Sequence, residues 1–250
     1  MNYPTNSIGG FMKNYTLIKS EERGHADHGW LKSFHSFSFA NYYNPNKIHF
    51  GALRVLNDDY VEGGKGFGKH PHDNMEIVSI ALEGDLEHAD SMGNKTVISQ
   101  GDIQVMSAGT GVFHSEYNKN PDKPVKFLQI WIFPKVKNVT PRYDQISLVK
   151  KDRHNQLQQV LSPSPSDNGV WIHQDVWFHM GIFDKGASSK YQLKMNNNGV
   201  YAFVLKGNWD IDGNKLAQRD ALEITGVEQL QLTAETQDAE ILLMEVPMKL

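Results

Sequence analysis

The sequence of 250 residues contains no cysteine. Disulfides, thiolate metal ligands and a cysteine nucleophile are therefore excluded. Any metal site in this chain must be built from nitrogen and oxygen ligands. The absence of disulfides also fits a reducing compartment.

Long apolar runs are missing as well. No segment approaches the roughly 20 apolar residues of a membrane span, and residues 1–15 lack the apolar core of a signal peptide. We therefore expect a cytoplasmic protein that does not insert into membranes. Met12 is an alternative start, in which case residues 1–11 are an extension.

Positive charge is scarce too. The formal net charge is -4, and the densest basic cluster, residues 150–153, contains an acid. A negative field repels phosphate backbones, so we expect no direct binding of nucleic acid. Apolar residues make up 39% of the chain, enough for one large domain or two of about 125 residues.

Short segments rich in Val, Ile, Leu and aromatic residues dominate the sequence, with Gly and Asn between them. No long stretch has a helical period. This pattern predicts an all-β fold, as in a sandwich or barrel. The clearest strand segments are His49–Asn57, Met75–Leu82, Asp102–Met106 and Val125–Phe133.

The second half repeats the first in outline. Each half has the order strand, Gly, strand, Gly-Asn-Lys, Asp, strand, from Ile80 to Asp102 and again from Val204 to Asp220. This order indicates two similar β-lobes that arose by internal duplication. The Ser- and Pro-rich segment 161–169 between them is typical of a linker, because Pro interrupts strands and helices.

Two histidine-containing pairs carry the chemistry. His70 and His72 are two residues apart, and so are His114 and Glu116. On a strand, residues i and i+2 point to the same face, so each pair can reach one ion. Three imidazoles and a carboxylate are a ligand set for divalent first-row metals.

The context of these pairs resembles the two cupin motifs. Gly64-x5-His70-x-His72-x3-Glu76-x7-Gly84 is similar to the first motif, although the gap after Glu76 is one residue longer. The segment from Gly101 to Asn118 is similar to the second motif. In that segment Ser107 replaces the usual Pro, and two extra residues precede His114.

More specifically, the chain resembles the pirin family. The resemblance is carried by residues 23–31, 37–43, 66–72 and 106–118. It implies two tandem cupin lobes, each a double-stranded β-helix of jelly-roll type, with metal in the N-terminal lobe. Some pirins cleave flavonols such as quercetin with dioxygen, and others are described as iron-dependent nuclear co-regulators.

The expected organisation follows from the repeat and the resemblance. We expect an extension with a first strand over 1–22, a metal-binding cupin lobe over 23–145, a linker over 146–169 and a degenerate cupin lobe over 170–250. Counting back from Gly207 as the histidines count back from Gly84 reaches Leu193 and Met195. Neither is a ligand for a hard divalent ion, so we expect no metal in the second lobe.

The identity of the carboxylate ligand is less clear from the sequence. Glu76 shares strand parity with His70 and His72, so spacing alone permits it as the ligand. The resemblance to pirins implies Glu116 instead, with Glu76 as a group that orients an imidazole. Among the other histidines we expect hydrogen bonding in the fold for four and exposure for two. The four are His25, His28, His35 and His49, and the two are His88 and His154.

The expected function is that of a flavonol 2,3-dioxygenase of the pirin type, with no phosphate-binding loop or nucleophile elbow to suggest otherwise. The resemblance implies one divalent metal, with Fe(II) favoured and Zn, Ni, Cu or Mn as alternatives. It acts as a Lewis acid on a small aromatic substrate. Glu116 is the expected catalytic residue, as ligand and proton acceptor.

Two alternatives remain at this point. One is an iron-dependent redox sensor that binds a metabolic enzyme or transcription factor. The other is a structural bicupin with an incidental metal.

Overall fold

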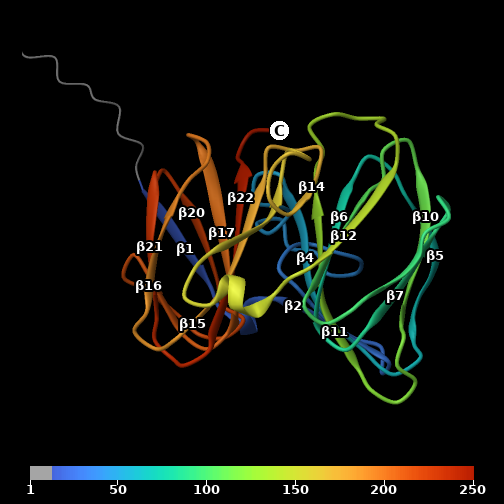
Figure 1. Cartoon of the computed structure of the whole chain (residues 1–250), viewed down its shortest axis with the longest axis horizontal. Helices are drawn as coiled ribbons and strands as arrows, with labels where there is room; N and C mark the ends of the chain where they lie inside the picture. The colour runs from blue at the N-terminus through green and yellow to red at the C-terminus, as the bar shows by residue number, and fades with distance from the viewer. Residues whose placement is uncertain (1–12) are drawn as a thin grey trace, which may run out of the picture.

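The computed structural model describes residues 13–250, so the proposed start at Met12 lies outside the described residues. This part of the chain folds into 22 β-strands and two short 3-10 turns, arranged as two lobes side by side (Figure 1). The predicted all-β, two-lobed architecture is confirmed. None of the helices in residues 13–250 is long and apolar enough to cross a membrane.

The first lobe is a barrel of two sheets. Its large sheet has the order β12-β9-β6-β11-β4-β3-β2, and its small sheet has the order β5-β10-β7-β8. The strands are β2 (Gly24–Asp27), β3 (Leu31–His35), β4 (Leu53–Val61), β5 (Gly66–His72), β6 (Glu76–Glu83), β7 (Leu86–Asp90), β8 (Lys95–Ile98), β9 (Asp102–Ser107), β10 (Val112–Asn118), β11 (Val125–Ile132) and β12 (Arg142–Ser147).

The second lobe has the same construction. Its large sheet has the order β1-β20-β17-β22-β15-β13-β14, and its small sheet has the order β16-β21-β18-β19. The strands are β1 (Asn14–Ile18), β13 (Gln158–Ser162), β14 (Val170–Trp171), β15 (Trp177–Phe183), β16 (Ser188–Gln192), β17 (Asn198–Lys206), β18 (Trp209–Ile211), β19 (Asn214–Leu216), β20 (Ala221–Thr225), β21 (Gln229–Ala234) and β22 (Ala239–Pro247). The turns η1 (Ser20–Glu22) and η2 (Lys150–Arg153) lie outside the sheets.

The strand orders of the two lobes match one to one, which confirms the predicted duplication. One strand of the second lobe comes from the N-terminal end of the chain. β1 precedes the first lobe in sequence but pairs with β20 at the edge of the second lobe, where β12 pairs with β9 in the first. Figure 1 shows β1, in blue, among the orange and red strands. The second lobe is therefore built from chain segments that both precede and follow the first lobe.

Two boundaries differ from the sequence prediction. β13 lies inside the segment predicted as a linker and pairs with β15, so that prediction is wrong for residues 158–162. The apolar segment predicted as a strand from His49 begins as a strand only at Leu53. Residues 49–52 form a turn whose Ala52 amide donates to the Pro247 carbonyl oxygen of the second lobe, and this contact replaces sheet pairing.

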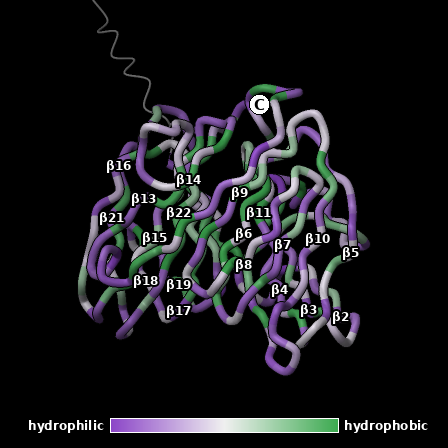
Figure 2. The backbone as a smooth tube through the Cα atoms, turned by 45° about the vertical axis from the view of Figure 1, so that its right-hand side comes forward, coloured by the Kyte–Doolittle hydropathy of each residue, from purple (hydrophilic) through white to green (hydrophobic). Residues whose placement is uncertain are grey.

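The largest hydrophobic core lies between the lobes. It joins apolar residues from the outer faces of both large sheets, such as Val78 and Leu128 from one lobe and Phe203 and Met244 from the other. The central strands are consequently buried on both faces, and β6 is apolar from Ile77 to Leu82 except at Ser79. Figure 2 shows the apolar residues of these strands in green. The inner face of each large sheet is left to line its own barrel, and these two interiors differ.

Candidate metal centre

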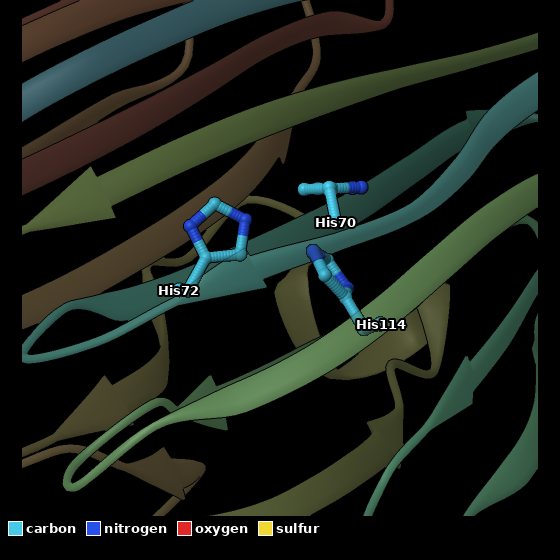
Figure 3. Close-up of side chains that lie close together, drawn as sticks. All are labelled: His70, His72 and His114. Atoms are coloured by element: carbon cyan, nitrogen blue, oxygen red, sulfur yellow. The ribbon is translucent and has the colours of Figure 1, made fainter.

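The metal-site histidines come from two neighbouring strands of the small sheet. β5 and β10 are antiparallel, with His114 opposite His70 and Val112 opposite His72. All three imidazoles point toward one another inside the barrel (Figure 3). One nitrogen of each lies within 4.8 Å of the others, and the ring centroids are 4.4–4.9 Å apart. The structure thus brings together the three predicted histidine ligands.

Local backbone features aim these side chains. The pairing of β10 with β5 shifts by one residue between His114 and Glu116, which is a β-bulge. Bulges beside functional sites redirect side chains and bend the strand. The strands also approach closely here, because a Cβ on Gly66 would lie 2.2 Å from the Glu116 carbonyl oxygen. Gly66 is therefore required for β10 to lie where it does.

The burial and protonation state of the imidazoles suit them to bind a cation. His114 is buried, and within residues 13–250 neither of its ring nitrogens has a hydrogen-bond partner. Leaving such atoms unpaired is costly unless a ligand satisfies them. Burial, and next the neighbouring imidazoles, lower the pKa of His114 to about 2, and burial lowers that of His72 to about 4. Both rings are neutral at pH 7, with lone pairs available for a metal.

The tautomer of His70 is also fixed. Its Nδ1 lies 2.8 Å from the Gly68 carbonyl oxygen, so Nδ1 carries the proton and Nε2 is free to coordinate. A backbone partner of this kind orients metal-binding histidines in many sites. The residues present therefore fit a divalent first-row metal.

Glu116 lies deeper in the barrel and is buried. Gln129 donates to both of its carboxylate oxygens, at 2.9 and 3.1 Å, and Ser79 donates to one at 3.2 Å. Burial raises the pKa of Glu116. One carboxylate oxygen forms a second cluster with nitrogens of His88 and His114, also within 4.8 Å of one another. His114 thus belongs to both clusters, and Glu116 to the second.

His88 was predicted to be exposed, and this prediction is wrong. It is fully buried on β7, directly across from Glu116 on β10. Its Nε2 lies 3.1 Å from Asp90, and its Nδ1 has no partner among the described residues. The signal was present in the sequence, because Leu86 and His88 are two residues apart and a strand that buries the first also buries the second.

The parity argument for Glu76 is also wrong. The chain turns between β5 and β6, with Asn74 in the left-handed region at φ 45°, so Glu76 lies on another strand of the other sheet. Ser79 on β6 faces Glu116, and Glu76 therefore faces the opposite side of the sheet. There it accepts a hydrogen bond from Ser107 at 2.6 Å and contacts Nδ1 of His173, from the second lobe, at 3.1 Å.

Among the remaining histidines, His35, His49 and His154 follow expectation, whereas His25 and His28 are exposed and their rings make no hydrogen bond within residues 13–250. His35 is buried and contacts Asn57 Oδ1 at 2.8 Å, and Nδ1 of the exposed His49 contacts the Gly51 carbonyl oxygen at 2.8 Å. His25 is exposed and stacks on Phe34. His154 is exposed, as predicted.

A cavity of about 230 Å³ adjoins the imidazoles. One part of its wall is aromatic and apolar, and another part is polar. Its lining residues include the four predicted ligands together with Ala26, His28, Leu31, Ser33, His35, Phe39, Ala40, Asn57, Asp59, Phe67, Gln129 and Trp131. A small aromatic molecule could reach the ligands from this cavity.

The second lobe is packed differently at the equivalent place. By strand pairing, Tyr191 and Leu230 correspond to His70 and His114, since they face each other between β16 and β21. The sequence count reached Leu193 and Met195 because the β16–β17 connection is two residues longer than the β5–β6 connection. The barrel interior there is mainly a core of buried apolar side chains, beside which Tyr191 donates a hydrogen bond to the buried Glu245 at 2.7 Å and packs against His179.

This strand order, repeated twice with an imidazole cluster inside the first barrel, defines a bicupin. Comparison with known proteins places the chain within that class. A model of the pirin family matches residues 17–132, and a model of the quercetinase C-terminal cupin domain matches residues 159–246. The chain belongs to the pirin family.

Named relatives extend over almost the whole chain. The quercetin 2,3-dioxygenase of Escherichia coli K12 is 46% identical over 92% of this chain and 98% of its own length. A pirin-like protein of Caulobacter vibrioides is 37% identical over 90% and 96%. The crystal structure of the bacterial pirin YhhW from Escherichia coli in complex with nickel(II) matches with a TM-score of 0.88 and 44% identity, covering 94% of this chain and 99% of that one.

Proposed function

We propose that this protein is a metal-dependent dioxygenase that cleaves flavonols such as quercetin with dioxygen. One observation carries the proposal: His70, His72, His114 and Glu116 line the same cavity as Phe39, Phe67 and Trp131. A metal ligand set with an aromatic-walled space beside it suits a flat, oxygen-bearing aromatic substrate. The relatives named quercetin 2,3-dioxygenase support the same substrate class.

The proposed ligands are the three imidazoles and Glu116. A divalent metal held by them would supply a Lewis acid that polarises an oxygen of the substrate. Four protein ligands leave positions open on a five- or six-coordinate ion, unlike the closed tetrahedral set of a structural zinc site. Glu116 is linked to the three imidazoles through His114, which belongs to both clusters.

Glu116 is also the proposed proton acceptor. Its raised pKa brings its basicity closer to that of the hydroxyl it would deprotonate. Gln129 and Ser79 hold the carboxylate in place and limit its loss of orientation. The aromatic residues Phe67 and Trp131 would pack against the substrate rings and exclude water.

We propose iron(II) as the metal in the cell. The same donor set accepts manganese, nickel, copper and zinc, and affinity generally rises from manganese to copper. Protein purified from an overexpressing host can therefore carry a different metal from the one used in the cell. The absence of cysteine supports a reducing cytoplasm as the place of action.

The test is an assay of chelated and reloaded protein. Aliquots with each of the five metals are incubated with quercetin and dioxygen, while flavonol absorbance, oxygen uptake and carbon monoxide release are followed. Loss of flavonol with matching carbon monoxide, fastest with iron(II), is the expected result. No turnover with any metal would contradict the proposed function, and activity with nickel or copper but not iron would contradict the metal assignment alone.

A further inference from the structure

A second group of buried polar residues lines the cavity, and neither the ligand set nor the proton acceptor accounts for it. Ser33 and His35 lie on β3, and Asn57 and Asp59 lie on β4. The two residues on each strand are two positions apart, so all four side chains share the inner face of the sheet. All four are at most 5% exposed and line the cavity beside the imidazoles.

These residues form two cross-strand pairs. Ser33 faces Asp59, and its hydroxyl donates to one carboxyl oxygen of Asp59. His35 faces Asn57, with Nδ1 2.8 Å from Asn57 Oδ1. Burying polar groups on a sheet is costly unless partners satisfy them, and these four residues face an open cavity that a ligand can enter. The pairs therefore indicate a ligand with polar groups of its own.

The second lobe provides an internal comparison. Asp59 is opposite Phe127 on β11, and the equivalent pair between β15 and β22 is Gly181 opposite Ile241. The equivalent of Gln129 is Leu243, and the second lobe thus has no carboxyl or amide at these two places. The second interior also buries polar residues, since His179 takes the place of Asn57 and Glu245 that of Trp131, but it has no equivalent of the Asp59 carboxyl group.

Asp59 lies one step farther along the sheet from Glu116 than Asn57 does. Gln129, which donates to Glu116, is opposite Asn57 on β4. Asp59 lies two residues farther along the same strand, roughly 7 Å away from Asn57. A molecule that contacts both Glu116 and Asp59 must therefore be extended, with hydroxyl groups at separate positions on an apolar body.

The chemical state of Asp59 suits such a contact. Burial raises its pKa to about 7 even though the Ser33 hydroxyl favours the charged form. Near neutral pH the carboxyl group can therefore donate or accept a hydrogen bond. Its second oxygen is the one that a substrate hydroxyl would meet.

We propose that Ser33 and Asp59 form a hydroxyl-recognition subsite that selects flavonols with hydroxyl groups remote from the one that meets Glu116. This inference rests on the proposed function and names the substrate groups that the cavity recognises. Asp59 is a specificity-determining residue in this account. It is not expected to contribute to metal binding.

The experiment compares two flavonols on metal-loaded holoenzyme. Quercetin carries several remote hydroxyl groups, whereas 3-hydroxyflavone has the flavonol hydroxyl alone. Asp59→Leu should lower kcat/KM for quercetin by about ten- to a hundredfold, the loss expected for a hydrogen bond to a charged or strongly polarised group. It should lower kcat/KM for 3-hydroxyflavone much less than kcat/KM for quercetin, and metal content should stay at one ion per chain. Asp59→Asn, which keeps a donor and an acceptor, should restore most of the quercetin activity.

Asp58→Asn is the matched control. Asp58 is the adjacent acid but faces outward, where it pairs with Arg23 and Arg219. It should leave the ratio of the two kcat/KM values unchanged. Ser33→Ala provides a second route if Asp59→Leu does not fold, because it removes the hydroxyl partner of Asp59 and should weaken quercetin selectively.

The outcomes separate the two proposals. A wild-type holoenzyme that turns over neither flavonol would overturn the proposed function. A wild-type enzyme that turns over both, with variants that affect both flavonols equally or neither, would overturn the subsite while leaving the function intact. Selective loss of quercetin turnover in Asp59→Leu or Ser33→Ala supports the subsite.

Discussion

In the first lobe, strand β10 carries His114 and Glu116 into the barrel, whereas the equivalent strand β21 of the second lobe carries Leu230 and Leu232. The strand orders around them are identical. The first interior holds the imidazole cluster, Glu116 and a cavity, whereas the second is filled by a largely apolar core that also buries His179 and Glu245. The fold therefore does not determine the chemistry of its interior, and a few side chains on the inner faces do.

The comparison also explains how the first lobe can carry a costly interior. Unpaired imidazole nitrogens and buried carboxyl groups oppose folding. The core between the lobes and the core inside the second lobe consist of buried aliphatic and aromatic side chains, each of which stabilises the fold by about 1.5–3 kcal/mol. The second lobe and the interface thus offset part of the cost of the polar interior of the first lobe.

The largest expected effect comes from removing the histidine common to both clusters. His114→Ala should reduce metal content from one ion per chain to almost none and abolish turnover, because it removes a ligand from the centre of the site. The apo protein should remain folded, since the substitution also removes two unpaired buried nitrogens. Elemental analysis after chelation and reloading checks this, and full retention of metal would contradict the ligand assignment.

The next effect separates the two candidate carboxylates. Glu116→Gln, loaded with excess metal, should still bind flavonol but turn over about 10²–10⁴-fold more slowly, as expected for loss of a general base. Glu76→Gln is the matched control and should keep metal and most activity, because Glu76 contacts Ser107 and His173 on the other face of the sheet. Metal loss in Glu76→Gln beside an active Glu116→Gln would show that the wrong carboxylate was chosen.

A substitution at the equivalent position of the second lobe should lower stability and leave metal binding unchanged. Leu230 occupies the position equivalent to His114. Its replacement by Ala leaves a cavity in a packed core, so Leu230→Ala should lower the free energy of unfolding by about 2–5 kcal/mol. Metal content of the folded protein should stay at one ion per chain. Denaturant unfolding and elemental analysis measure the two quantities. A Leu230→Ala protein of normal stability would mean that the second interior is not the stabilising core proposed here.

The smallest effect concerns pH. The pKa of His114 in the folded apo protein lies far below the value near 6.5 of an unfolded chain. Between these values the unfolded state binds more protons, so this imidazole makes apo stability rise with pH up to about 6.5. Asp59 and Glu116 have raised pKa values and act in the opposite direction.

A difference between two proteins isolates the imidazole. The unfolding free energy of apo wild type, measured from pH 5 to pH 7, should rise more steeply than that of His114→Leu. Replacement of the exposed His25 by Leu controls for loss of any imidazole. Equal slopes in wild type and His114→Leu would contradict the burial of His114 as a neutral ring.

Short apolar segments predicted the all-β fold, and the spacing of the histidines together with the cupin-like motifs and the resemblance to pirins predicted the three imidazoles. Residues two positions apart, such as His70 and His72, lie on the same face of any strand. The order of glycines and turns is preserved in both halves of a duplicated chain. Glu76 failed because its parity was counted through a turn, and a turn resets which face a side chain takes. The equivalents of the histidines in the second lobe were miscounted by two residues for the same reason, a difference in loop length.

Asp59 needed tertiary information. It lies on the inner face of a strand whose sequence alone does not say which face is inner. The strand β1 in the second lobe is a further case, since pairing between residues about 200 positions apart leaves no local pattern. Periodicity thus locates ligands within a strand, and pairing between strands decides what they face.

The most direct test of the account is anomalous diffraction from metal-loaded crystals, recorded at the absorption edge of the bound metal. The account predicts a single peak in the first lobe, within about 2.0–2.3 Å of nitrogens of His70, His72 and His114 and of a Glu116 oxygen, as for first-row metal–ligand bonds. No peak should occur near Tyr191 and Leu230 of the second lobe. A peak held by His88, His114 and Glu116 without His70 and His72, or a second peak in the other barrel, would contradict it.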